Sequence, residues 1–291
     1  MKRSNHRVMT FVSAFSAAWI ILFTGNYANL DASHVTNPAS LDASHVKNPA
    51  GLDASHTINP DASNVSLPMS HGEKLLFQIR WGMVQAGEAV LHAMPFQNLK
   101  GTESHRFVLE LKTSSAVDRF YKVRDKIESY TDLGISRSLF YSKKATGRDK
   151  RDVKIYFDWN NHTASYSNFN QVRESIGIEE GAFDPLAALY GIRSREFSVD
   201  SEISFPITDG KRSFMGKARI VGREKIELGG ITYDTYLVEP ELVHFDGVFK
   251  KSKNPELKIW MTADHRKMPV KIECKVLVGS ITGELVDAVM L

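Results

Sequence analysis

Residues 257–276 read LKIWMTADHRKMPVKIECKV, and this stretch decides the fold. Apolar side chains occupy every second position on either side of a polar turn at residues 264–267. A period of two is the pattern of a β-strand that buries one face and exposes the other. The stretch therefore predicts two antiparallel strands joined by a tight turn. The predicted buried positions are Leu257, Ile259 and Met261 before the turn, and Val270, Ile272, Cys274 and Val276 after it.

The same alternation runs through most of the chain after residue 71, and it is clear in VKIYFDW at residues 153–159. Turn residues separate the alternating runs at Asn160-Asn161, Asp209-Gly210 and Gly229-Gly230. Further strands are expected at residues 74–80, 86–94, 105–113, 123–131, 137–146, 163–168, 201–207, 214–227, 231–239 and 280–289.

Roughly a dozen antiparallel strands are more than a flat open sheet normally carries. The sequence predicts an all-β fold: a single large antiparallel β-barrel, half-barrel or sandwich with one or two short helices. One helix is expected at residues 183–192, with Asp184 as N-cap and Pro185 in the first helical position, and a short turn at residues 118–121. Because so short a helix is not stable alone, it should plug or flank the sheet. No linker divides residues 71–291, so they are expected to form one β domain.

Residues 1–28 have the pattern of an export signal. Basic residues at the start precede an uncharged, apolar run at residues 8–25. We expect cleavage near Ala28 rather than a retained anchor, although the run is near the lower length limit for a membrane-spanning helix. If the signal is not cleaved, residues 8–25 would attach the protein to a membrane. Either outcome predicts a periplasmic or cell-envelope location.

Residues 29–70 contain a repeat with a period of eleven. LDASHV at residues 30–35 recurs at 41–46, and LDASHT follows at 52–57. Each unit has few apolar residues and ends in Asn-Pro, so it cannot bury enough surface to offset its chain entropy. We predict a disordered linker. The repeated histidines and aspartates allow weak metal binding, but duplication in an unconstrained linker is the favoured interpretation.

Charge and cysteine content limit the function. The 291 residues have 37 Lys and Arg against 34 Asp and Glu, a balance that does not favour nucleic-acid binding. The single cysteine, Cys274, is expected to be a small buried side chain rather than a nucleophile. No phosphate-binding glycine loop, dinucleotide fingerprint, His-Glu-x-x-His or Gly-x-Ser-x-Gly motif occurs. We expect no cofactor, no metal site and no enzymatic activity.

Two histidines lie near carboxylates, His162 near Asp158 and His265 beside Asp264. A His–Asp dyad would suit a hydrolase that acts on an envelope polymer. Short polar residues also populate tight turns, and this second interpretation is favoured. The hydrolase remains an alternative, with Asp158 and His162 as the residues to test.

Two groups of residues are candidates for binding. Cations surround a predicted hairpin with its turn at Gly147 and Asp149, where they would suit an anionic surface or an envelope partner, or simply keep a solvated edge from pairing. Aromatic residues recur through the strands, where they would line a cavity for an acyl chain or, as we prefer, fill the core. The hairpin cations are Lys143, Lys144, Arg148, Lys150, Arg151 and Lys154. The aromatic residues are Phe77, Trp81, Tyr121, Phe140, Tyr141, Phe157, Trp159, Phe169 and Trp260.

Several short motifs occur in a fixed order over nearly all of residues 71–291. They are GEKL at 72–75, GEA at 87–89, IESYTD at 127–132, FD at 157–158, DPLAALY at 184–190 with Arg193-Ser194, IWMTAD at 259–264, PVKI at 269–272 and residues 279–285. Together they resemble the bacterial family of unknown function DUF3108. The resemblance implies an exported envelope protein with an antiparallel β fold, related by analogy to lipoprotein-carrier half-barrels. It implies no activity and no catalytic residue, and the lack of a cysteine near residue 28 argues against N-terminal lipid anchoring.

The leading hypothesis is an exported, non-enzymatic cell-envelope protein that binds a lipid or other amphiphile in its β domain. Two alternatives stay open: an envelope assembly or scaffold protein that docks on a partner, and the envelope-polymer hydrolase. The sequence makes no prediction of oligomeric state. The expected binding residues are Lys143, Lys144, Arg148, Lys150, Arg151, Trp159 and Trp260.

Overall fold

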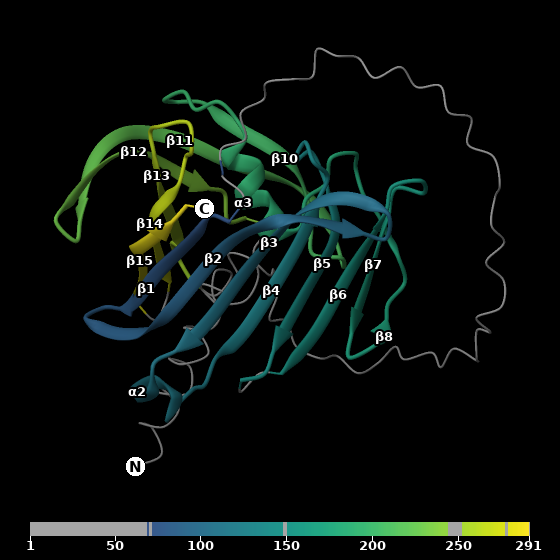
Figure 1. The fold of residues 1–291 in the computed structure, drawn as a ribbon, viewed down its shortest axis with the longest axis horizontal. Coiled ribbons are helices and arrows are strands. Elements are labelled where there is room, and N and C mark those ends of the chain that lie inside the picture. The colour runs from purple at the N-terminus through teal and green to yellow at the C-terminus, as the bar shows by residue number, and fades with distance from the viewer. Residues whose placement is uncertain (1–68, 70–71, 148–149, 244–251, 277–278, 291) are drawn as a thin grey trace. The chain divides into compact units, whose positions relative to one another are not determined.

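In the part of the chain that the computed structural model describes, fifteen β-strands form a single sheet (Figure 1). The structure describes residue 69 and residues 72–147, 150–243, 252–276 and 279–290. The predictions for residues 1–28, for nearly all of the linker at 29–70 and for Arg148 lie outside the described residues.

The strands follow the predicted runs closely, with two very short additions, β8 and β9. The strands are β1 (Lys74–Trp81), β2 (Val84–Leu99), β3 (Thr102–Thr113), β4 (Arg124–Thr131), β5 (Ser138–Ala145), β6 (Arg151–Asp158), β7 (Thr163–Asn168), β8 (Gln171–Val172), β9 (Ile176–Gly177), β10 (Glu202–Thr208), β11 (Ser213–Leu228), β12 (Ile231–Pro240), β13 (Glu256–Thr262), β14 (Pro269–Val276) and β15 (Gly279–Val289). The helices are α2 (Ser115–Asp118) and α3 (Pro185–Arg193).

The strands pair in an antiparallel meander, so the expected all-β fold is confirmed. One arm of the sheet consists of β1 to β8, and the other consists of β10 to β15. The two arms join where β1 pairs with β15, from Lys74 opposite Val289 to Trp81 opposite Ile281. The path from β10 to β8 is linear, without pairing between its ends in the described part of the chain, so the sheet is an open half-barrel rather than a closed barrel.

Alternation along each strand divides the sheet into an inner and an outer face. On β6, Val153 and Ile155 are buried on the inner face, whereas Tyr156 and Asp158 are exposed on the outer face. Cys274 is fully buried on β14, as its place among apolar residues predicts. Burial raises the pKa of its thiol to about 12. The inner face of both arms thus forms the hydrophobic core.

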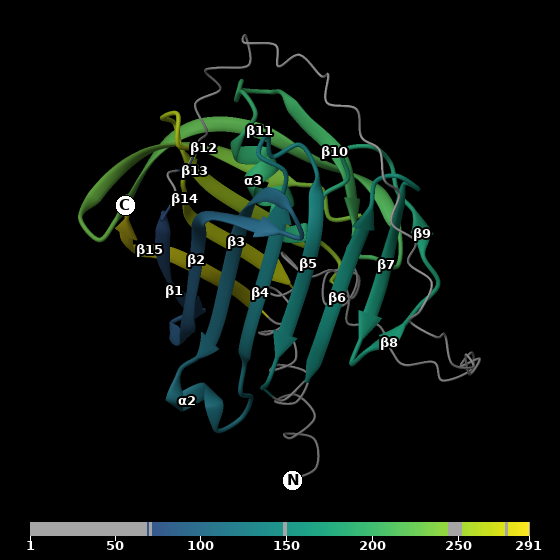
Figure 2. The ribbon, with the colours of Figure 1, turned by 45° about the vertical axis from the view of Figure 1, so that its right-hand side comes forward.

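Helix α3 lies between the two arms, in the hollow of the half-barrel (Figure 2). The predicted cap is confirmed: the Asp184 carboxylate accepts hydrogen bonds from the backbone N–H groups of Leu186 and Ala187. Ser129 of β4 and Ser138 of β5 donate to the same carboxylate, each at 2.6 Å. The start of the helix is therefore attached to the first arm, as expected for a helix that plugs a sheet.

The end of α3 is attached by a buried ion pair. Arg193 donates to both carboxylate oxygens of Glu73 at 2.6 and 2.8 Å, and both side chains are almost completely buried. The same guanidinium donates to the backbone carbonyl of Arg266, in the turn between β13 and β14. Between the two ends, the ring of Tyr190 stacks on Phe107 of β3, with 3.6 Å between centroids. These contacts fix the helix in one position.

Candidate functional site

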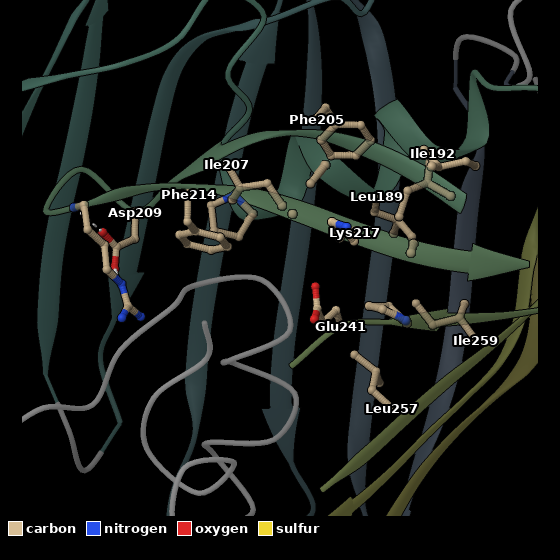
Figure 3. A pocket seen from close by; sticks show the side chains of 17 residues that line it. Leu189, Ile192, Phe205, Ile207, Asp209, Phe214, Lys217, Glu241, Leu257 and Ile259 are labelled. Atoms are coloured by element: carbon tan, nitrogen blue, oxygen red, sulfur yellow. Dashed lines mark hydrogen bonds and ion pairs between the residues drawn. The ribbon is translucent and has the colours of Figure 1, made fainter. Parts of the chain in front are cut away.

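An apolar pocket opens between α3 and the second arm of the sheet (Figure 3). The cavity itself has a volume of about 70 Å³, and it lies within a wider groove of about 840 Å³ that includes open solvent at its mouth. Thirteen of the seventeen lining residues are apolar, and four are charged. The lining residues are Pro185, Ala188, Leu189, Ile192, Ile203, Phe205, Ile207, Asp209, Arg212, Phe214, Gly216, Lys217, Ala218, Pro240, Glu241, Leu257 and Ile259.

The walls follow from the period of each element. Ile203, Phe205 and Ile207 alternate along β10, so all three present side chains to the same side. On the neighbouring strand β11, Ala218 pairs with Ile203 and Gly216 pairs with Phe205, whereas the partner of Ile207 is the large residue Phe214. The Ile207 side chain covers Gly216, since a Cβ atom added there would overlap Ile207 Cδ1, so this glycine allows close packing in the pocket wall.

Four charged residues line the pocket: Asp209, Arg212, Lys217 and Glu241. Asp209 lies at one end in Figure 3, away from Leu257 and Ile259, and its carboxylate accepts hydrogen bonds from the backbone N–H groups of Lys211 and Arg212. Lys217 lies nearer the middle of the view, close to Glu241, and pairs with Glu202 at 3.1 Å. Among the described residues, no cluster of His, Cys, Asp and Glu could hold a metal ion. The walls are suited to an apolar group rather than to acid–base chemistry.

The hairpin cations do not form one patch. Lys143 is on the inner face of β5, where it is 5% exposed and pairs with Asp125 at 3.4 Å. Lys144, the next residue, is exposed on the opposite face. Arg151 shares the inner face with Val153, whereas Lys154 shares the outer face with Tyr156, and Lys150 is exposed before β6. The expectation of a single basic surface at this hairpin is wrong for Lys143, because strand alternation turns it inward.

Neither of the two candidate tryptophans lines the pocket. Trp159 donates its indole N–H to the Ser138 carbonyl at 2.8 Å, next to Phe157. Trp260 is 8% exposed and donates to Glu224 at 2.7 Å, so it is covered on the face of β13 opposite Leu257 and Ile259. The other seven aromatic residues named from the sequence do not line this pocket either. Several of them fill the core, which was the preferred interpretation.

Asp158 and His162 contact different partners. The Asp158 carboxylate accepts hydrogen bonds from the backbone and side chain of Asn161 and from the backbone of Asn160, and these bonds lower its pKa. His162 Nδ1 lies 3.5 Å from a carboxylate oxygen of Glu180. Asp264 likewise bonds within its own turn, to Thr262 and Arg266. These arrangements agree with the turn interpretation of both sites.

Sequence reasoning missed the residues that make the pocket. Ala188 and Leu189 belong to the predicted helix, but nothing in the sequence indicates which strand faces them. The one usable signal was a pair of small residues, Gly216 and Ala218, inside a predicted strand, where a missing side chain often marks close approach or an open space.

The comparisons with known proteins concern the family and the fold. The family model described as "Protein of unknown function (DUF3108)" matches residues 76–286. A β-barrel-like protein of the DUF1849 domain of unknown function from Brucella abortus is similar in structure, with a TM-score of 0.52 at 7% identity, over 77% of this chain and 99% of that one. A putative lipoprotein from Parabacteroides distasonis ATCC 8503 matches with a TM-score of 0.33 at 11% identity, over 77% of this chain and 97% of that one. No curated protein matches the sequence significantly.

Among the described residues, no helix has the length and apolar character needed to cross a membrane.

Proposed function

Since the chain belongs to the DUF3108 family, whose function is unknown, we propose a function from its own residues. It is an exported, non-enzymatic cell-envelope protein that binds the apolar chain of a lipid or other amphiphile. The binding site is the pocket between α3, β10, β11 and β13. The export signal pattern at residues 1–28 supports the location, and the open, aliphatic pocket is the observation that carries the binding proposal.

The physical argument rests on unfilled apolar space. An apolar wall without neighbours loses dispersion contacts and remains partly hydrated, and both conditions cost free energy. An apolar chain in the pocket restores the contacts and gains about 25 cal/mol for each Å² of apolar surface that it removes from water. The helix that forms one wall is held at both ends by Asp184 and Arg193, so the pocket does not depend on the ligand for its shape.

Fluorescence of N-phenyl-1-naphthylamine, a neutral apolar dye, tests the proposal on the full chain. The wild-type protein should bind the dye and increase its emission. Ala188→Phe places a ring in the pocket and should weaken binding about tenfold, because losing roughly 55 Å² of apolar contact has that effect. Ala288→Phe makes the same change at an exposed position of β15, and should leave binding unchanged.

Retention of the melting temperature in both variants shows that neither substitution unfolds the protein. If Ala188→Phe binds the dye as tightly as Ala288→Phe, the pocket is not the binding site. If the wild-type chain does not bind the dye and carries no amphiphile when isolated from envelope extracts in native mass spectrometry, the proposed function is wrong.

A further inference from the structure

One end of the pocket adjoins a group of cations on the inner face of the first arm. The turn between β10 and β11, residues 209–212, packs on β6 and β7 there: a Cβ atom on Gly210 would lie 3.0 Å from Ile155 Cγ1 and 3.1 Å from Tyr166 Cβ. This turn brings Lys211 Nζ to 4.6 Å from the ring centroid of Tyr166. Asp209 and Arg212 of the same turn line the pocket.

Further cations come from two segments of the first arm. Arg173 follows β8, its backbone N–H donates to the Tyr166 carbonyl, and its guanidinium lies 5.6 Å from the ring centroid of Tyr166. Arg151 lies on the inner face of β6, and its charge acts on Tyr166 and on Lys211. We refer to these four residues as the inner basic cluster: Arg151, Lys211 and Arg212, which are partly buried, and Arg173, which is exposed.

Three cations and one carboxylate act on Lys211. The carboxylate is Asp209, which lies 3.6 Å from Arg212. Burial lowers the pKa of Lys211, and although Asp209 opposes this change, the charges of Arg173, Arg151 and Arg212 add to it. Cations that disfavour one another's charge, partly shielded from water, attract an anion strongly.

We propose that the ligand of the pocket is an anionic amphiphile, with its chain along the apolar walls and its carboxylate or phosphate group at the inner basic cluster. This inference rests on the proposed function, because it assigns a head group to the ligand of the same pocket. The observation behind the inference is that Asp209 and Arg212 both line the pocket and belong to the turn that carries Lys211, so the cluster lies next to the apolar walls. Salt bridges from Arg173 and Lys211 to the head group would add charge-assisted hydrogen bonds.

cis-Parinaric acid and its neutral methyl ester test the proposal with the full chain. The two fluorescent probes share a hydrocarbon chain and differ in the charge of the head. The wild-type protein should prefer the acid at least about tenfold, because only the acid can accept charge-assisted hydrogen bonds from the cluster. Arg173→Met with Lys211→Met should remove this preference and leave the affinity for the ester unchanged.

Lys144→Met with Lys154→Met is the matched control. It removes the same charge from the outer face of β5 and β6, so the preference for the acid should remain. Equal affinity of the wild-type protein for acid and ester overturns the head-group proposal but leaves the proposed function standing. Failure to bind either probe overturns both.

Binding experiments with inorganic phosphate distinguish a lipid head group from a free anion as the ligand of the cluster. For a lipid head group, millimolar phosphate should only weaken binding of the acid modestly, and phosphate alone should show no tight binding in calorimetry. If phosphate alone binds as tightly as the acid, and this binding is lost in the variant Arg173→Met with Lys211→Met, the cluster binds a free anion and the proposal is overturned.

Discussion

Cys274 is fully enclosed in the core, and its thiol has a pKa raised from 9.0 to about 12. The thiolate is the reactive form, so iodoacetamide should label the folded protein at pH 8 at least about a thousandfold more slowly than the unfolded chain. Mass spectrometry of labelling with and without guanidinium measures this ratio. Rapid labelling under native conditions would show that β14 opens readily.

The same thiol predicts a pH dependence. Because the folded state holds the proton more tightly, the Cys274 contribution to stability is complete below pH 9 and is lost as the pH rises toward about 12. Cys274→Ala should lower the melting temperature at pH 7, because it leaves a small cavity. Above pH 9, the melting temperature of this variant should fall less steeply with pH than that of the wild-type protein. Thermal melts at pH 7, 9 and 10 test the slope, and parallel curves for the two proteins would contradict the assignment.

Single residues also show what alternation can and cannot predict. Lys143 and Lys144 are adjacent in sequence, and the period of two already requires them to face opposite sides of β5. The sequence pattern therefore contained the information that the hairpin cations are divided between two faces. The pattern did not show that Lys143 forms an ion pair with Asp125 on β4, because that contact depends on which strands are neighbours.

At the scale of elements, α3 depends on the ion pair at its last turn. Arg193→Met leaves the Glu73 carboxylate buried without its guanidinium, and breaking a buried pair in this way costs about 3–5 kcal/mol. Urea denaturation of wild type and variant measures the loss. Lys258→Met, a cation that is partly exposed on β13, is the control and should cost less than about 1 kcal/mol.

The double variant Glu73→Gln with Arg193→Met tests the mechanism of that loss. Removing the second charge also removes the uncompensated carboxylate, so the double variant should be less destabilised than the sum of the single variants. Strict additivity would mean that the two side chains stabilise the fold independently, which contradicts the bidentate geometry.

Elements with a strong local signal were predictable from the sequence. The helix at 183–192 was predicted from Asp184 and Pro185, whose capping chemistry is local, and the long strands were predicted from their alternation. Strands β8 and β9 were missed because each has only two residues, too few for a period. The pocket was missed because its walls come from α3 and strands brought together by the sheet topology, a tertiary property that no local pattern encodes.

At the scale of the whole sheet, the turn at residues 209–212 contacts the first arm on the side where the end strands of the two arms, β10 and β8, do not pair with each other. A second connection comes from Phe183, just before α3, whose backbone forms an isolated β-bridge with Ile207 on the edge strand β10. The pocket and the inner basic cluster meet where the turn crosses to the first arm. Their geometry should therefore depend on that contact as much as on the strands themselves.

Two glycines with almost the same backbone conformation isolate the contribution of this contact. Gly210 has a φ of +77°, and a Cβ atom added there would lie 3.0–3.1 Å from atoms of Ile155 and Tyr166. Gly230 has a φ of +79°, and a Cβ atom added there would meet no other part of the described structure within 4 Å. Gly230→Ala should cost about 1–2 kcal/mol, the penalty of an L residue in the left-handed region. Gly210→Ala should cost that amount plus about 1–3 kcal/mol for overpacking.

Thermal denaturation measures the difference, because 1 kcal/mol shifts the melting temperature of a domain of this size by about 2–4 °C. Gly210→Ala should also weaken binding of cis-parinaric acid, since moving the turn displaces Lys211 and Arg212, whereas Gly230→Ala should not. Equal losses of stability and unchanged binding in both variants would mean that the turn does not hold the arms together. The inner basic cluster would then need another support, because Lys211 reaches Tyr166 only through this turn.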